Sequence, residues 1–80
     1  MRIDKFLKVS RIIKRRTVAK EVCDGGKVKV NGRVAKAGTD VVAGDEIEIQ
    51  FGEKLFHARI KEVRETVPAK EADSLYEVLV

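Results

Sequence analysis

The feature that most constrains this chain is the stretch of residues 14–32, KRRTVAKEVCDGGKVKVNG. Its apolar residues first follow a helical period, the pair Gly25-Gly26 interrupts them, and from Lys27 onward cationic and apolar residues alternate. A glycine pair of this kind ends a helix because glycine adopts the left-handed conformation without steric cost. The alternation indicates a strand, and Asn31-Gly32 is typical of a two-residue hairpin turn. The stretch therefore predicts a helix followed directly by a β-hairpin.

Within the predicted helix, we expect Thr17 to cap the N-terminus with its hydroxyl group. Residue 20 is Lys rather than Glu or Gln, so the sequence supports a simple cap and not a reciprocal capping box. The expected apolar stripe of this helix consists of Val18, Ala19, Val22 and Cys23. Cys23 is thus expected to be a small buried hydrophobe rather than a reactive thiol.

The rest of the chain supplies one helix upstream and more strands downstream. The spacing of Ile3, Phe6 and Leu7 predicts a helix over residues 4–9, followed by a bend in which Ile12 and Ile13 point inward. The downstream pattern predicts strands at residues 33–36, 46–51, 55–63 and 75–79, with a short helical or irregular piece at 69–74. We therefore expect an α+β fold, in which an N-terminal helical hairpin packs on a small antiparallel sheet, forming one domain over residues 1–80.

Charge divides the chain into two unlike parts. Residues 1–36 contain twelve Lys and Arg against three acids, whereas residues 37–80 contain five against ten. This segregation favours a polyanionic partner for the surface that the first part builds. One Cys and one His cannot form a zinc site of the usual ligand number, and the sequence contains no dinucleotide or P-loop motif. We therefore expect no metal, no cofactor and no catalytic activity. With no signal peptide and no membrane-spanning stretch in the sequence, we also expect a cytoplasmic location.

Residues 15–19, RRTVA, and residues 26–32, GKVKVNG, are similar to the signature of the RNA-binding domain named after ribosomal protein S-four. The opening MRIDKFL resembles the Arg-Leu-Asp entry of that family, and the resemblance covers about residues 1–50. Within the family, residues 2–11 and 13–17 look most like RqcP, a group of short bacterial factors of ribosome-associated quality control. They are also related to the heat-shock protein of about fifteen kilodaltons. Arg15 stands where many members of the family have Ser, which makes the cationic corner stronger here.

The resemblance implies an S-four-like fold, also described as αL-type, and a role in translation. It implies binding at the junction of large-subunit ribosomal RNA and P-site tRNA on stalled, split ribosomes. It also implies support of the RqcH-dependent addition of C-terminal alanine tails, with RqcH on the same ribosome. The expected partners are therefore ribosomal RNA, P-site tRNA and RqcH, without a membrane, and we expect the protein to be a monomer.

The candidate RNA-binding residues are mainly long cations that a rigid frame could hold against phosphates. They are Arg2, Asp4, Lys5, Lys8, Arg11, Lys14, Arg15, Arg16, Thr17, Lys20 and Arg33. Thr17 and the free amides at the start of its helix would add a phosphate contact. The helical period places Phe6, the one aromatic residue among these cations, in the core. We therefore expect recognition of RNA shape and backbone rather than stacking of bases on exposed rings.

Four acidic or titratable residues need an interpretation of their own. Asp4 is either a carboxylate that the helix dipole favours at a helix start, or a group that orients Arg2 or Lys8 or accepts a hydrogen bond from RNA. Glu46 and Glu48 are expected on one solvated face of a strand, where they would repel RNA towards the other side. His57 has no nucleophile motif beside it, so we expect no catalytic role for it.

Two other functions stay open at this point. The chain could be the RNA-targeting domain of an rRNA-modifying enzyme, such as a pseudouridine synthase or a methyltransferase. It could also be a small DNA-binding regulator that uses the helical hairpin as a helix-turn-helix. Against the regulator, the exposed side of the second helix carries Lys20, Glu21 and Asp24, which are few base-reading residues.

Overall fold

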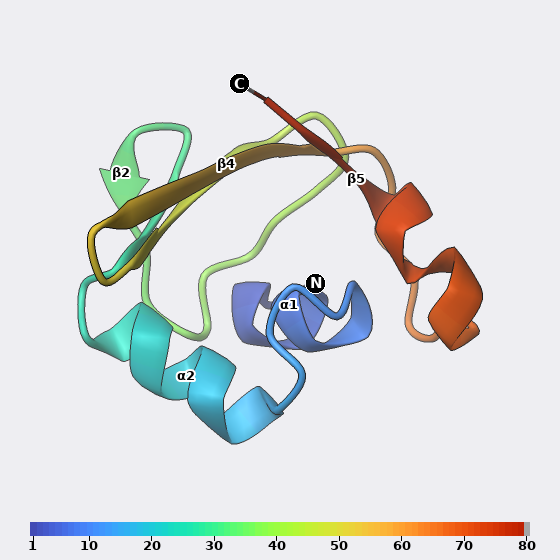
Figure 1. Cartoon of the computed structure of the whole chain (residues 1–80), viewed down its shortest axis with the longest axis horizontal. Coiled ribbons are helices and arrows are strands. Elements are labelled where there is room, and N and C mark those ends of the chain that lie inside the picture. The colour runs from blue at the N-terminus through green and yellow to red at the C-terminus, as the bar shows by residue number, and fades with distance from the viewer. Residues whose placement is uncertain (80) are drawn as a thin grey trace.

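The computed structural model describes residues 1–79, and in it a curved antiparallel sheet arches over a pair of helices (Figure 1). The elements are α1 Ile3–Val9, α2 Arg16–Asp24, β1 Val28–Val30, β2 Arg33–Val34, β3 Glu46–Phe51, β4 Lys54–Ile60, the 3-10 helix η1 Ala69–Leu75 and β5 Tyr76–Val78. The sheet order is β2-β1-β3-β4-β5, with all neighbours antiparallel. The expected α+β class, a helical hairpin on a small antiparallel sheet, is confirmed. Within residues 1–79, no helix has the length and apolar character needed to cross a membrane.

The end of α2 follows from the glycine pair. Gly25 is the C-cap, and Gly26 has a φ of +78°. The Gly26 amide donates to the carbonyl of Cys23 at 3.0 Å, and the Lys27 amide donates to the carbonyl of Val22 at 3.1 Å. These two bonds form a Schellman motif, which satisfies carbonyl groups that the last helical turn leaves free. The predicted helix stop is therefore confirmed, and β1 begins directly after it.

The predicted turn between β1 and β2 is also confirmed. Asn31 and Gly32 have φ values of 51° and 83°, which is the type I′ geometry of a two-residue hairpin. The Asn31 side chain donates from Nδ2 to Asp45 Oδ1 at 3.0 Å and accepts from the Glu46 amide at 2.9 Å. These bonds attach the hairpin to the start of β3, which pairs with β1.

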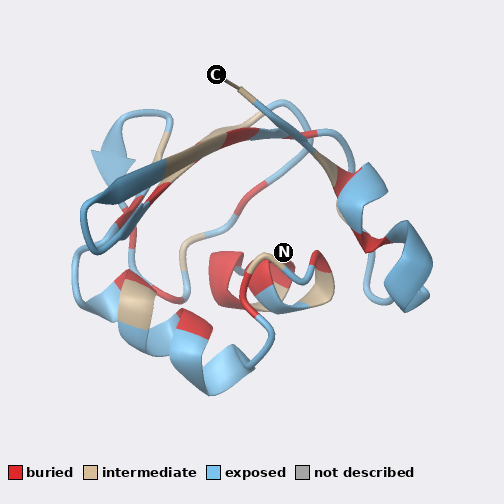
Figure 2. Ribbon diagram, viewed as in Figure 1, coloured by how far each residue is buried: buried red, intermediate tan, exposed pale blue. Residues whose placement is uncertain are grey.

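The core lies between the helices and one face of the sheet (Figure 2). From α1, Ile3, Phe6 and Leu7 are fully buried, and the sheet contributes Val28, Ile47, Ile49, Ala58 and Ile60. Full burial of a Leu, Ile or Phe side chain stabilises a fold by about 1.5–3 kcal/mol, so α1 is firmly attached to the sheet. Both α1 and α2 lie on the same side of the sheet in Figure 1, which leaves its other face open to solvent.

Two predictions for α2 are wrong. Thr17 does not cap the helix, because the N-cap is Arg15 in an extended conformation and no side chain caps it. The Ala19 amide already bonds to the carbonyl of Arg15 at 3.0 Å, so Thr17 lies inside the first turn. Val18 is 40% exposed and lies outside the buried stripe. The helix packs instead through Ala19 and Cys23, which turns Val18 towards solvent.

Two strands end two or three residues earlier than the pattern predicts. β2 ends at Val34 because the chain then turns inward, which buries Ala35 and Ala37. β4 ends at Ile60 because the next amide, that of Lys61, donates to the carbonyl of Leu75 at 2.8 Å and directs the chain towards η1. The predicted helical piece and last edge strand are confirmed as η1 and β5.

Candidate nucleic-acid interface

The centre of the candidate interface is a buried carboxylate between two arginines. Arg2 donates to both oxygens of Asp4, from Nε to Oδ1 at 3.2 Å and from Nη2 to Oδ2 at 3.3 Å. Arg16 Nε lies 3.5 Å from Asp4 Oδ2, and the Lys5 amide donates to Oδ1 at 2.8 Å. The Asp4 side chain is 3% exposed, whereas those of Arg2 and Arg16 are 50% and 47% exposed. This arginine pair, Arg2 and Arg16, therefore keeps guanidinium donors on the solvent side.

Each member of this group is positioned by a different part of the fold. Arg2 is extended just before α1, and its backbone forms a β-bridge with Asp40. Asp4 lies in the first turn of α1. Arg16 is the first residue of α2, which packs against the core through the buried Ala19. The arginine pair therefore depends on the packing of the two helices and on the loop that precedes β3.

The contact with Arg2 that one interpretation of Asp4 requires is present, and Asp4 also lies in the first turn of α1, as the helix-dipole interpretation requires. The first of these interpretations also offered Lys8 as a partner, but Lys8 is exposed and pairs with no acid within residues 1–79. The sequence gives no sign of the contact between Asp4 and Arg16, because a bend separates the two helices and no periodic pattern links them. That contact is the main feature of the site that sequence reasoning misses.

The bend between α1 and α2 presents its cations to solvent, as predicted. Ile13 is buried and Ile12 is half-buried, while Arg11, Lys14 and Arg15 are exposed. Arg11 has a φ of 62°, a left-handed conformation that costs a residue with a side chain roughly 1–2 kcal/mol. It directly follows Ser10, the C-cap of α1, at the position where helices most often have glycine. A long cation at such a position suggests that its side chain is needed there.

We expect Arg11→Gly to stabilise the fold by about 0.5–1 kcal/mol and to weaken RNA binding several-fold. Stability rises because glycine adopts the observed φ without steric cost, although its greater freedom in the unfolded chain offsets part of the gain. Affinity falls because one phosphate contact is lost. Urea unfolding and filter binding measure the two effects, with Arg64→Gly as the control for a surface arginine outside this bend. Lower stability together with unchanged affinity would contradict this prediction.

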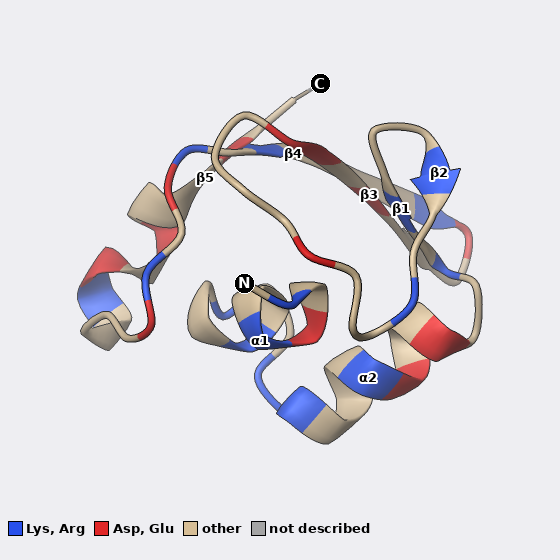
Figure 3. Ribbon diagram, turned by 180° about the vertical axis from the view of Figure 1, so that it is seen from behind, with Lys and Arg blue, Asp and Glu red and all other residues tan. Residues whose placement is uncertain are grey.

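The other candidate residues surround this centre unevenly. Lys5 projects from α1 and pairs with Glu65, whereas Lys8 on α1, Thr17 and Lys20 on α2 are exposed. Arg33 lies on β2, an edge strand of the sheet, and Figure 3 shows this strand apart from α1. The structure therefore brings Arg2, Asp4 and Arg16 into one group and leaves Arg33 on a separate part of the surface.

The open face of the sheet carries residues of both charges. Glu46 and Glu48 share this face as predicted, but both are half-buried. Glu46 Oε1 lies 3.0 Å from His57 Nε2, and its Oε2 lies 3.5 Å from Arg59 Nη2. Glu46 is therefore paired with a cross-strand cation, Arg59, which the predicted solvated face does not imply. Glu48 lies opposite His57 in the register of β3 and β4.

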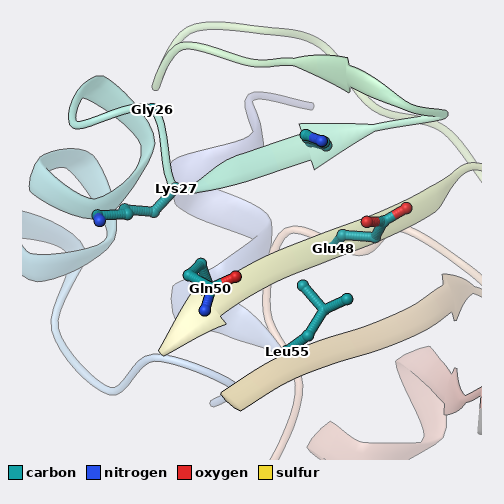
Figure 4. Close-up of a pocket in the computed structure, with 6 residues that line it drawn as sticks. Gly26, Lys27, Glu48, Gln50 and Leu55 are labelled. Atoms are coloured by element: carbon teal, nitrogen blue, oxygen red, sulfur yellow. The ribbon is translucent and has the colours of Figure 1, made fainter. Parts of the chain in front are cut away.

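A shallow hollow of about 320 Å³ lies on the same open face (Figure 4). Its lining residues are Gly26, Lys27, Lys29, Glu48, Gln50 and Leu55. The hollow joins the end of α2 to β1, β3 and β4, and the sequence gives no sign of it. Because Glu48 offsets part of the lysine charge, this hollow does not continue the cationic surface of the helices.

Cys23 is fully buried on the inner side of α2, as predicted. Burial raises the pKa of its thiol to about 11, with smaller contributions from the charges of Asp4 and Asp24. The thiolate is the reactive form of cysteine, so Cys23 stays neutral and unreactive near pH 7.

Comparison with known proteins agrees with this geometry. Residues 1–47 match the family model of the S4 domain. The chain is 64% identical to the RQC P-site tRNA stabilizing factor of Halalkalibacterium halodurans over 98% of its own length and 89% of that protein. It is 52% identical to the Bacillus subtilis protein of the same name, over 99% of its own length and 92% of that protein. Its structure resembles the trimeric structure of Vibrio cholerae heat shock protein 15, with a TM-score of 0.90 and 32% identity, covering 99% of this chain and 81% of that chain.

The helical hairpin, the β1–β2 hairpin and the arginine pair all lie within the matched residues and together define an S4-domain protein. Within that class, the two relatives that match over nearly their full length share one name. The chain belongs to the family of the RQC P-site tRNA stabilizing factors, the RqcP family.

Proposed function

We propose that this protein is a non-catalytic, cytoplasmic RNA-binding factor that holds P-site tRNA on the large ribosomal subunit of stalled, split ribosomes. The observation that carries the proposal is the arginine pair, two half-exposed guanidinium groups anchored on one buried carboxylate. Such groups bind phosphates through paired hydrogen bonds in a fixed geometry. The choice of tRNA is supported by the relatives, whose name states that they stabilise P-site tRNA.

The proposed mechanism is positional and electrostatic. The arginine pair and the exposed cations of the bend contact phosphates of ribosomal RNA and tRNA together, which fixes one against the other. These contacts carry no sequence information, because phosphates are the same at every position. RqcH binds the same subunit, and a tRNA held in this way supports repeated addition of alanine to the stalled chain.

The two alternatives that the sequence leaves open receive less support than this proposal. An RNA-targeting domain of an rRNA-modifying enzyme is disfavoured because relatives that match over 89% and 92% of their own length are named stabilizing factors. A DNA-binding regulator would read base edges from an exposed helix. The exposed side of α2 offers only Thr17, Lys20 and Glu21 for this purpose, which are few base-reading residues, so this alternative is also disfavoured.

Sedimentation through sucrose gradients tests the proposed function. The tagged protein is followed in lysate with and without induced translational stalling. We expect co-migration with large subunits, enriched in peptidyl-tRNA after stalling, and persistence of this peak when double-stranded DNA is added as a competitor. Migration only at the top of the gradient would reject the ribosomal role, and displacement by DNA would favour the regulator.

A further inference from the structure

Residues 61–68, between β4 and η1, bring an acidic side chain to the edge of the cationic surface. We call this segment the strap. Val63 and Val67 attach it to the molecule, since both pack against the core. Between these two anchors, the Glu65 side chain is 76% exposed and its Oε2 accepts a hydrogen bond from Nζ of Lys5 on α1.

The contact between Lys5 and Glu65 joins the basic and acidic parts of the chain. Lys5 is one of the candidate RNA-binding residues, and its side chain is 35% exposed. The hydrogen bond from Lys5 lowers the pKa of Glu65, and the charge of the amino terminus acts in the same direction. Glu65 is therefore fully ionised near pH 7. The other glutamate of the strap, Glu62, pairs within the strap, with Arg64 at 3.5 Å.

Beyond this contact, the strap does not pack tightly on α1. A hollow of about 80 Å³ lies between Lys8, Val9 and Arg11 on one side and Glu65, Thr66 and Val67 on the other. A phosphate that approaches Lys8 or Arg11 from this side meets the carboxylate of Glu65. Lys5 binds a phosphate less strongly while it pairs with Glu65, because the carboxylate repels the phosphate and takes one donor of the ammonium group.

We propose that Glu65 is an autoinhibitory carboxylate, which occupies Lys5 in the free protein and lowers its affinity for RNA backbone. This inference rests on the proposed function. An exposed ion pair in water is weak, so a ligand with many phosphate contacts displaces Glu65 easily. A flexible RNA with few fixed contacts does so less readily. The strap thus favours a structured RNA surface over the single-stranded RNA that is abundant in the cell.

The test compares Glu65→Gln with wild type on two probes, poly(U) and purified large subunits carrying peptidyl-tRNA. We expect Glu65→Gln to bind poly(U) about threefold to tenfold more tightly, with a smaller gain on subunits. The slope of log affinity against log salt concentration for poly(U) should steepen by about 0.7, since Lys5 then adds one phosphate contact to a single strand. Glu62→Gln is the matched control, because it removes the same charge from the same strap, and it should change affinity less than twofold.

A double-mutant cycle shows whether the effect acts through Lys5. In a Lys5→Gln background, Glu65→Gln should change the affinity for poly(U) by less than twofold. Equal gains from Glu62→Gln and Glu65→Gln, or an undiminished gain without Lys5, would overturn the proposal. The proposed function fails separately, if wild-type protein binds poly(U) and not the subunits. Urea unfolding of every variant confirms that the compared proteins are folded.

Discussion

The double variant Arg2→Ala/Arg16→Ala should bind large subunits carrying peptidyl-tRNA about 100-fold more weakly than wild type, and each single variant about tenfold more weakly. A hydrogen bond to a charged group contributes about 1.5–3 kcal/mol, which corresponds to a factor of ten or more for each arginine. The slope of log affinity against log salt concentration should become shallower by about 1.5, because two phosphate contacts disappear. Affinity is measured by co-sedimentation at several salt concentrations.

The design must separate lost contacts from lost stability. The double variant leaves Asp4 buried with the Lys5 amide as its hydrogen-bond donor, and an unpaired buried charge is destabilising. Adding Asp4→Asn removes that charge, so the triple variant should regain stability in urea unfolding without regaining affinity. A control double variant, Lys54→Ala/Arg59→Ala, removes two cations from β4. If this control lost as much affinity as the double arginine variant, total charge rather than the arginine pair would explain binding.

The local signals in the sequence predict much of the fold because backbone conformation decides them. The Gly25-Gly26 and Asn31-Gly32 pairs favour left-handed backbone, and Gly26, Asn31 and Gly32 each have a positive φ where the helix stop and the turn need it. The predictions for Thr17 and Val18 fail for a different reason. A capping hydroxyl contributes typically about 1 kcal/mol, less than the burial of α2 against the core, so packing decides where the helix starts and how it is rotated.

The sequence predicts the cationic character of the site but not its geometry. Charge segregation and family resemblance predict a set of candidate RNA-binding residues, without showing which of them converge. The contacts that organise the surface, Asp4 with Arg16 and Lys5 with Glu65, join segments that meet only in the folded chain. Arg33 is grouped with the other cations by the sequence alone. In the structure it lies on the edge strand β2, apart from the arginine pair.

Asp4→Asn should weaken binding to the same subunits about tenfold and lower stability by about 1–3 kcal/mol. The direction of the affinity change is informative, because this substitution raises the formal net charge of +4 by one. Long-range attraction to a polyanion would therefore tighten binding. The asparagine keeps an oxygen for the Lys5 amide, but its NH₂ group cannot accept from a guanidinium. Arg2 and Arg16 then lose their fixed orientation, and each must be ordered again when a phosphate binds.

Asp40→Asn is the matched control for this test. Asp40 lies beside Arg2 in the β-bridge, but its side chain is 84% exposed and 3.9 Å from the amino terminus. The substitution Asp40→Asn makes the same change in net charge and leaves the side-chain contacts of the arginine pair in place, so we expect equal or slightly tighter binding. If both variants tightened binding, Asp4 would merely reduce the local positive charge, and the two arginines would act as independent cations. Weaker binding by Asp4→Asn alone would mean that the orientation of Arg2 and Arg16 outweighs the repulsion from a buried negative charge, which makes Asp4 a positioning residue.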